Sequence, residues 1–124
     1  MQKLLLIGLA GALGALTRYS LSGFVQRYSG FTFPVGTLVV NLLGTFLFGF
    51  IWSLVEQRLV ISVETRVVIL SGFLGAFTTF SSFMFETSAL VGDGQWGYAL
   101  LNITAQIVLG MIAIFLGLAA GRAI

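Results

Sequence analysis

Four uncharged and mostly apolar stretches run along the chain, over residues 4–17, 28–55, 67–85 and 94–121. A helix needs roughly 20 apolar residues to cross a bilayer. The last three stretches are long enough on their own. The first becomes long enough only if Arg18 lies inside the helix near one end, which carries the helix to about Val25. The pattern therefore predicts four transmembrane helices, at about residues 3–24, 34–55, 63–91 and 96–121.

The composition of the chain also indicates a membrane protein. Of its 124 residues, 58% are apolar and 8% are charged, whereas a soluble domain has about 25% charged residues. We therefore expect one all-α integral membrane domain over residues 1–124. The net charge of +2 comes from Lys and Arg beside the helices, so it does not indicate a nucleic-acid partner.

Basic residues near the helix ends encode the orientation of the chain only weakly. With both termini in the cytoplasm, more of them lie inside than outside: Lys3, Arg58, Arg66 and Arg122 against Arg18 and Arg27. Loops rich in Lys and Arg tend to stay in the cytoplasm. Because the bias is small, we expect that the chain can insert in both orientations.

The third stretch carries polar residues in its middle, within the sequence GFLGAFTTFSSFMFE (Gly72–Glu86). Thr79, Ser82 and Glu86 are three and four residues apart, so they share one face of a helix. Hydrocarbon penalises polar groups without partners. Polar side chains at such positions usually face protein or a water-filled path. This face favours a conduit for a small hydrated solute.

A stripe of phenylalanine residues lies beside this polar face. Phe80 and Phe83 alternate with Ser81 and Ser82. Phenylalanine is common in this chain, and such rings often serve only in core packing or lipid contact. However, the edge of an aromatic ring is positive. Ring edges next to hydroxyl groups could attract an anion without a full charge that would trap it.

The middle of the third stretch is also predicted to be broken. Gly72 and Gly75, followed by Thr78 and Thr79, could serve simple helix packing, because Ser and Thr can bond back to the carbonyl four residues earlier. The alternative is an interrupted helix, which frees backbone carbonyls that can bind a cation when they are buried in protein.

Amide side chains occur in the second and fourth predicted helices. Asn41 lies on one face with Thr37 and Thr45, and Asn102 and Gln106 form a pair four residues apart. A single amide could be an interhelical hydrogen bond. Amides and hydroxyls on three of the four helices favour the lining of a route.

Two charged residues fall within or near the predicted helices. Arg18 could extend its side chain to the interface, or it could attract an anion into a vestibule. Glu86 could mark one end of a pore, or it could lie at a wet interface.

Enzymatic chemistry is not indicated. The chain has no His and no Cys, which excludes Ser-His-Asp and Cys-His arrangements and thiolate metal sites. The glycines of GALGAL lie inside a predicted span with no strand before them, so they are not a dinucleotide motif.

Three motifs resemble those of one known family. GALGALTRY (Gly11–Tyr19), GTLVVNLLG (Gly36–Gly44) and GFLGAFTTFSSFMFE (Gly72–Glu86) fall in order in the first three predicted helices. Together they resemble the CrcB/Fluc fluoride channels over essentially the whole chain. The resemblance implies passive fluoride export across the bacterial cytoplasmic membrane. It also implies an antiparallel, dual-topology homodimer with two pores and a buried central Na⁺.

The resemblance further implies roles for individual residues. Along the fluoride route it places Phe80, Phe83, Asn41, Ser81, Ser82 and Glu86, with Arg18 in the vestibule region. Gly75 and Thr78 match the positions whose backbone carbonyls bind Na⁺. The fourth helix departs from some members of the family, one of which has Tyr and Ser in a polar track. Asn102 and Gln106 fall at those places, and both can hydrogen-bond an anion along the fluoride route.

Two other functions remain open on the sequence. A small four-helix drug/proton antiporter has a similar length, but its chemistry needs a carboxylate in the first span, where this chain has Arg18. A non-transporting assembly subunit would use Asn41 and the glycines for packing, but it would leave the polar face beside the phenylalanines unexplained.

Overall fold

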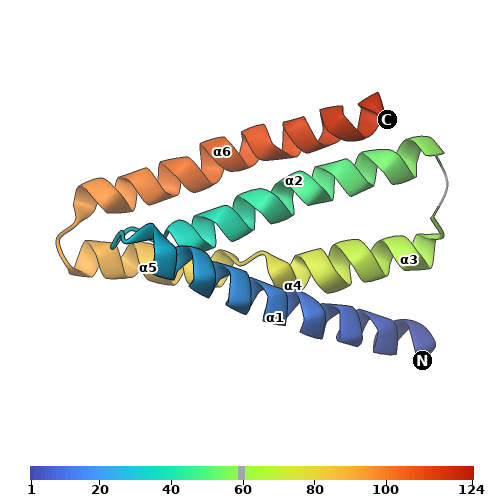
Figure 1. Cartoon of the computed structure of the whole chain (residues 1–124), viewed down its shortest axis with the longest axis horizontal. Helices are drawn as coiled ribbons and strands as arrows, with labels where there is room; N and C mark the ends of the chain where they lie inside the picture. Colours follow the sequence, from blue (N-terminus) through green and yellow to red (C-terminus); the bar gives the residue numbers. More distant parts are fainter. Residues whose placement is uncertain (59–60) are drawn as a thin grey trace.

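Four long helices make up the computed structural model, which describes residues 1–58 and 61–124 (Figure 1). The first, second and fourth spans are α1 (Gln2–Ser29), α2 (Val35–Arg58) and α6 (Trp96–Ala123). The third span consists of α3 (Val63–Val67), the π-helix η1 (Val68–Leu74), α4 (Gly75–Phe77) and α5 (Phe80–Gly92). All four are long and apolar enough to cross a membrane, which confirms the predicted number. The protein is therefore a multi-pass membrane protein.

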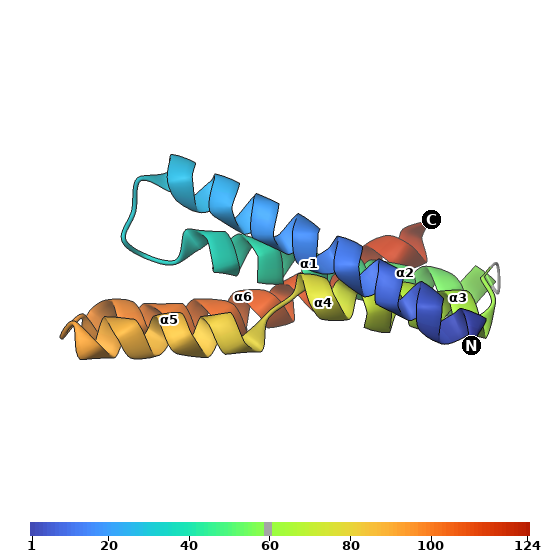
Figure 2. The same cartoon turned by 90° about the horizontal axis from the view of Figure 1, so that it is seen from below.

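Both termini lie at the same end of the molecule (Figures 1 and 2). The connection between α1 and α2 and the turn between α5 and α6 lie at the opposite end. Successive spans therefore run in alternating directions, as four passes through one bilayer require. Figure 2 shows that α1 crosses the rest of the molecule obliquely, while α6 runs beside α2 in Figure 1.

Helix α1 continues past residue 24, where the sequence pattern placed its end, and stops at Ser29. Gly30 follows with φ of 66°, a left-handed conformation that glycine adopts without steric cost. The side chain of Gln26 then holds the loop, because its Nε2 donates to the carbonyls of Phe31 and Phe33 and its Oε1 accepts from the Gly36 N–H. These bonds fix the connection into α2.

Close helix contacts depend on glycines. A Cβ atom on Gly117 of α6 would collide with the backbone carbonyl of Phe46 on α2, and one on Gly14 of α1 would collide with that of Phe73 on η1. Small residues let membrane helices approach closely, where van der Waals packing supplies much of the association energy. The pairs α2–α6 and α1–η1 are the most extensive helix contacts.

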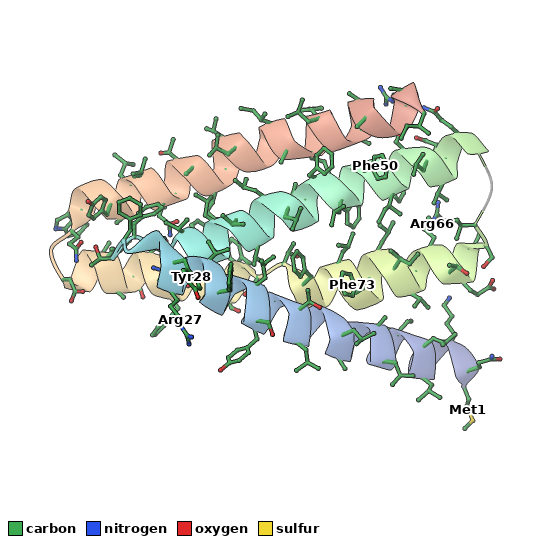
Figure 3. All side chains as sticks on the ribbon, in the orientation of Figure 1. Met1, Arg27, Tyr28, Phe50, Arg66 and Phe73 are labelled. Atoms are coloured by element: carbon green, nitrogen blue, oxygen red, sulfur yellow. The ribbon has the colours of Figure 1, made fainter. Side chains whose placement is uncertain are left out.

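A small apolar core lies where the third span meets α2. Its buried members are Val40, Leu70, Leu74 and Phe77. Nearer the end that carries the termini, Figure 3 shows Arg66 pointing toward α2, where its guanidinium lies 5.1 Å from the centroid of the Trp52 ring. These contacts hold the third span against α2 on one side of its interruption.

Two of the four spans are largely uncovered. Within their most apolar windows, only 6% of α1 and 6% of α6 is buried inside the chain, against 28% for each of the other two spans. Their exposed side chains are mainly large and apolar, including Leu13, Leu16, Ile112 and Phe115. In a membrane these surfaces contact lipid or another protein.

Candidate functional site

The third span is interrupted at Thr78 and Thr79. Thr78 has ψ of 156°, and Thr79 has φ of −147° and ψ of 116°, so both residues are extended. Helix α4 ends before them and α5 begins at Phe80. The predicted break in this span is therefore confirmed. An extended segment leaves backbone groups without helical partners, and these must find partners elsewhere in the protein.

The side chain of Asn41 supplies two of those partners. Its Oδ1 accepts a hydrogen bond from the Thr79 N–H at 2.8 Å, and its Nδ2 donates to the Thr79 carbonyl at 3.0 Å. The amide of Asn41 thus pairs with the backbone of Thr79 on both sides, as a neighbouring β-strand would. This contact explains how an asparagine on α2 stabilises an interruption in another span.

Thr79 also caps the helix that follows it. Its Oγ1 accepts from the Ser82 N–H at 3.2 Å and donates to the Ser82 Oγ at 3.0 Å. The hydroxyls of Thr79 and Ser81 lie 3.3 Å apart. A threonine that accepts a hydrogen bond from the N–H three residues later is a standard helix N-cap. Ser81 and Ser82 are therefore held at the first turn of α5, beside the interruption.

Two of these hydrogen bonds, from the Thr79 N–H to Asn41 and from the Ser82 N–H to Thr79 Oγ1, leave the carbonyls of Gly75 and Thr78 without their helical donors. In a continuous helix these carbonyls would accept from the N–H groups of Thr79 and Ser82. Those N–H groups donate instead to Asn41 and Thr79 Oγ1. Gly75 and Thr78 also line a cavity of about 160 Å³, together with Gly44, Thr45, Phe48, Leu74 and Ile114. Neutral carbonyl oxygens are the donors that a hard cation prefers, so the residues present fit a sodium ion.

A second cavity, of about 290 Å³, lies beside the interruption. It is lined by Asn41, Thr45, Thr78, Thr79, Phe80, Phe83, Gln106 and Ile107. The rings of Phe80 and Phe83 meet edge to face, with centroids 5.7 Å apart and planes at 73°. Phe83 is only 5% exposed, whereas Phe80 is 73% exposed within the single chain. The cavity therefore combines amides, hydroxyls and aromatic rings, and it opens toward one side of the chain.

Gln106 reaches this cavity from α6. Its Oε1 accepts a hydrogen bond from Asn41 Nδ2 at 3.0 Å. Its Nε2 is buried and has no hydrogen-bond partner within residues 1–58 and 61–124. A buried amide donor without a partner is costly.

Arg18 lies close to the interruption but is not among the residues that line either cavity. Its Nε donates to the backbone carbonyl of Ala76 at 3.1 Å. In a continuous helix the Ala76 carbonyl would accept from the N–H of Phe80, so the guanidinium of Arg18 provides a partner where α4 ends. Sequence reasoning named Arg18 but missed Ala76, because a backbone acceptor has no signal in the sequence.

Glu86 lies on α5, one turn beyond Ser82, and its side chain contacts α2. Its Oε1 accepts a hydrogen bond from Thr37 Oγ1 at 2.6 Å. Its Oε2 is buried and has no partner among the described residues. Glu86 and Thr37 are absent from the lining of the 290 Å³ cavity. The predicted polar face of the third span is therefore divided between the interruption and this separate contact.

Asn102 is completely buried between α6 and α5. Its Nδ2 donates to Thr87 Oγ1 at 2.9 Å, and Thr87 Oγ1 donates to the carbonyl of Phe83 at 2.7 Å. Asn102 does not line the 290 Å³ cavity, although Gln106, one turn later, does. Thr87 was missed from the sequence. Its position four residues after Phe83 was the available signal, since threonine can bond back to that carbonyl.

The structure thus brings together part of the predicted site. Asn41, Phe80, Phe83 and Gln106 meet at one cavity, and Ser81 and Ser82 adjoin it through Thr79. The other predicted residues, Arg18, Glu86 and Asn102, lie outside this cavity. Their side chains bind the Ala76 carbonyl, Thr37 and Thr87, respectively. A membrane protein with one interrupted span and a polar cavity beside the interruption is built like a channel or transporter.

Comparisons with known proteins give the family. Residues 5–118 match the model of the family described as CrcB-like protein, Camphor Resistance (CrcB). The match covers most of the chain, and the chain therefore belongs to the CrcB-like family. The family resemblance suggested by the three sequence motifs is confirmed.

Several relatives are similar over their whole length. A protein of Nitratidesulfovibrio vulgaris is 51% identical over 122 residues, covering 98% of each chain. A protein of Nitrosococcus oceani is 54% identical over 116 residues, covering 94% of this chain and 93% of its own. A protein of Solidesulfovibrio magneticus is 50% identical over 124 residues, covering 100% and 99%. All three are named fluoride-specific ion channel FluC.

Proposed function

We propose that this protein is a fluoride-selective channel that lets fluoride leave the cell passively across the cytoplasmic membrane. The observation that carries the proposal is the cavity at the interruption, where Asn41, Gln106 and the rings of Phe80 and Phe83 converge. The names of relatives about 50% identical over the full length support the same function. A channel needs no catalytic group, so the protein is not an enzyme.

The chemistry of the cavity suits fluoride. Fluoride is small and strongly hydrated, so hydrogen-bond donors must replace its water before it can enter a membrane protein. Amide and hydroxyl groups can donate, and the positive edges of aromatic rings add weaker attraction. None of these groups carries a full charge, so an ion that enters can also leave.

The fluoride route extends beyond the cavity in this proposal. The hydroxyls of Ser81 and Ser82 continue it along the first turn of α5, and Glu86 lies one turn further. Asn102 contributes from α6 through Thr87, and Arg18 provides positive charge near the interruption. We assign these residues to the route because they are polar groups on the spans that surround the cavity.

We further propose that two copies of the chain form an antiparallel homodimer. Phe80 lines the cavity and yet is 73% exposed in one chain, so a single chain does not enclose the site. The largely uncovered spans α1 and α6 offer surfaces for a partner. The weak bias of Lys and Arg is compatible with insertion in both orientations.

Na⁺ is the structural ion that this arrangement would hold. The carbonyl oxygens of Gly75 and Thr78 would bind it. They lack their helical donors because those N–H groups bind Asn41 and Thr79 instead. On a two-fold axis each carbonyl would be present twice, which gives about four oxygen ligands, as suits a hard cation. The ion would stabilise carbonyls that otherwise cost several kcal/mol each in the bilayer core.

Ion flux from liposomes that contain the purified protein tests the proposed function. With the membrane voltage clamped by a potassium ionophore, we expect rapid fluoride efflux, much slower chloride efflux and no requirement for a pH gradient. Fluoride movement that stops when the pH gradient is removed would instead support an antiporter. No flux of either ion from well-folded protein would support an assembly subunit.

The orientation of the chains can be tested separately with Ala123→Cys. The native chain has no cysteine, and Ala123 is exposed at the end of α6. We expect a membrane-impermeant thiol reagent to label this variant when it is applied to the outer face of the cytoplasmic membrane, and also when it is applied to the cytoplasmic face. Labelling from one side only, in a preparation that conducts fluoride, would contradict the antiparallel homodimer.

A further inference from the structure

A cavity of about 500 Å³ lies between the first and third spans, at the end of the molecule that carries the termini. Figure 1 shows α1 and α3 moving apart toward this end. The cavity is lined by residues from the start of each span: Gln2, Lys3, Leu6, Glu64, Thr65 and Val68. None of them lines the two cavities at the interruption, so this cavity is separate from the proposed fluoride site.

The cavity lies at the depth of the lipid headgroups. Helix α1 has 28 residues, which at 1.5 Å per residue gives a length of about 42 Å, whereas the hydrocarbon core of a bilayer is about 30 Å thick. The ends of α1 therefore extend into the headgroup layer. Lys3 stands directly before the first uncharged stretch, and Glu64 stands shortly before the third. Leu6 and Val68 follow one turn later, toward the hydrocarbon.

Two opposite charges face this cavity without neutralising each other. Lys3 and Glu64 both line it, yet neither forms an ion pair with another residue in the described parts of the chain. Glu64 is held in the first turn of α3, because Ser62 caps that helix and its Oγ accepts from the Thr65 N–H at 3.2 Å. A ligand that carries a negative and a positive group can therefore pair with both side chains at once.

We propose that this cavity binds the headgroup of phosphatidylethanolamine. The phosphate accepts hydrogen bonds from the Lys3 ammonium and the Gln2 amide, and the primary ammonium of the ethanolamine donates to the Glu64 carboxylate. The acyl chains begin along Leu6 and Val68 and continue into the hydrocarbon. The polar part of the cavity and its apolar part thus match the two parts of one phospholipid.

The same groups discriminate between phospholipids. Phosphatidylglycerol has a phosphate but no cation, so it leaves Glu64 unpaired beside a second negative charge. Phosphatidylcholine has a quaternary ammonium that carries no N–H, so it cannot donate a hydrogen bond to the carboxylate. We therefore expect phosphatidylethanolamine to bind in preference to both. Because the cavity lies away from the interruption, this inference does not depend on the proposed function.

Native mass spectrometry of the purified full-length protein tests the preference. The protein in detergent is incubated with equal amounts of dioleoyl phosphatidylethanolamine, phosphatidylcholine and phosphatidylglycerol. We expect one phosphatidylethanolamine to be retained per chain, with an affinity about three- to tenfold above that of the other two lipids, as for a charge-assisted hydrogen bond at a partly exposed site.

Substitutions of the two charged residues test the assignment of the headgroup. Glu64→Gln should bring the retention of phosphatidylethanolamine down to that of phosphatidylcholine, because the ammonium loses its carboxylate. Lys3→Met should lower the retention of all three lipids, because each has a phosphate, and Lys3→Arg should restore it. The matched controls are Glu56→Gln and Arg122→Met, since both residues are exposed near the same end of the molecule and neither lines the cavity.

Three outcomes would overturn the inference. The first is equal retention of the three lipids by the native protein. The second is a preference for phosphatidylethanolamine that Glu64→Gln leaves unchanged, or that the two control substitutions reduce as much. The third is a change in the proportion of monomer and dimer, measured by size-exclusion chromatography, with lipid retention unaltered by Lys3→Met and Glu64→Gln. That result would assign the cavity to contact with a second copy of the chain.

Discussion

Arg18 donates a hydrogen bond from its Nε to the backbone carbonyl of Ala76 at 3.1 Å, and so connects the first span to the last residues before the interruption of the third. The positive charge lies at the carbonyl end of α4, where a cation is favoured. Arg18 thus takes part in holding the interruption, in addition to any effect on ions that approach the protein.

We therefore predict that Arg18→Met lowers the free energy of unfolding by about 1 to 3 kcal/mol, because the carbonyl of Ala76 loses a charged donor. Thermal unfolding in detergent measures this, and fluoride flux should fall as well. Arg27→Met is the control, since Arg27 is exposed near the end of the same helix. Equal unfolding temperatures for the two variants would mean that the bond to Ala76 contributes nothing.

Phe80 and Phe83 should respond differently to substitution. Phe83 is 5% exposed and Phe80 is 73% exposed in the single chain. We expect Phe80→Ile to reduce fluoride flux without unfolding the chain. The substitution removes the ring edge, but this exposed side chain contributes little to packing within the chain. Phe83→Ile should reduce both flux and thermal stability. Size-exclusion chromatography, thermal unfolding and liposome flux give the three readouts. Full flux in both variants would assign these rings to packing only.

Thr87 and Asn102 should be energetically coupled. Thr87→Val leaves the buried Nδ2 of Asn102 without its acceptor, and we expect a cost of about 1 to 2 kcal/mol. Asn102→Leu in the Thr87→Val background removes the unpaired group, so it should cost less there than in the native protein. A double-mutant cycle on thermal unfolding measures the difference. If the effects of the two substitutions on stability simply add, the hydrogen bond between Thr87 and Asn102 contributes nothing to stability.

Gly117 should not tolerate a methyl group. A Cβ atom there would collide with the carbonyl of Phe46, whereas one on Gly110 of the same helix would meet nothing within 4 Å. We expect Gly117→Ala to destabilise the protein by about 1 to 3 kcal/mol, as overpacking does, and Gly110→Ala to have little effect on packing within the chain. If both variants unfold at the same temperature, α2 and α6 are free to separate slightly.

The number of spans and the interruption of the third could be predicted from local sequence. Hydrophobic length depends only on consecutive residues, and uncharged runs of this length are stable as helices in a bilayer. Gly75 and the two threonines that follow Phe77 indicated the break for the same reason, because backbone preferences act over a few residues. The polar face with its flanking phenylalanines was likewise visible as periodicity.

The partners of the polar side chains could not be predicted in this way. Asn102 and Gln106 lie one turn apart on one face of α6, yet Asn102 binds Thr87 of α5 while Gln106 binds Asn41 of α2. Spacing fixes the face of a helix but not the neighbour that this face meets at each level. Helix α6 contacts both α2 and α5, and the crossing of the helices decides which one each amide reaches.

The sequence by itself therefore determined a four-span membrane protein with a broken third helix and a set of polar residues suited to an anion route. Only the tertiary structure decided that Asn41 uses its N–H groups on Thr79 and Gln106, that the Nε2 of Gln106 has no partner among the described residues, and that Arg18 binds the carbonyl of Ala76. The physical reason is that hydrophobicity and helix periodicity are local properties. Hydrogen-bond direction between spans depends on how residues distant in sequence are brought together.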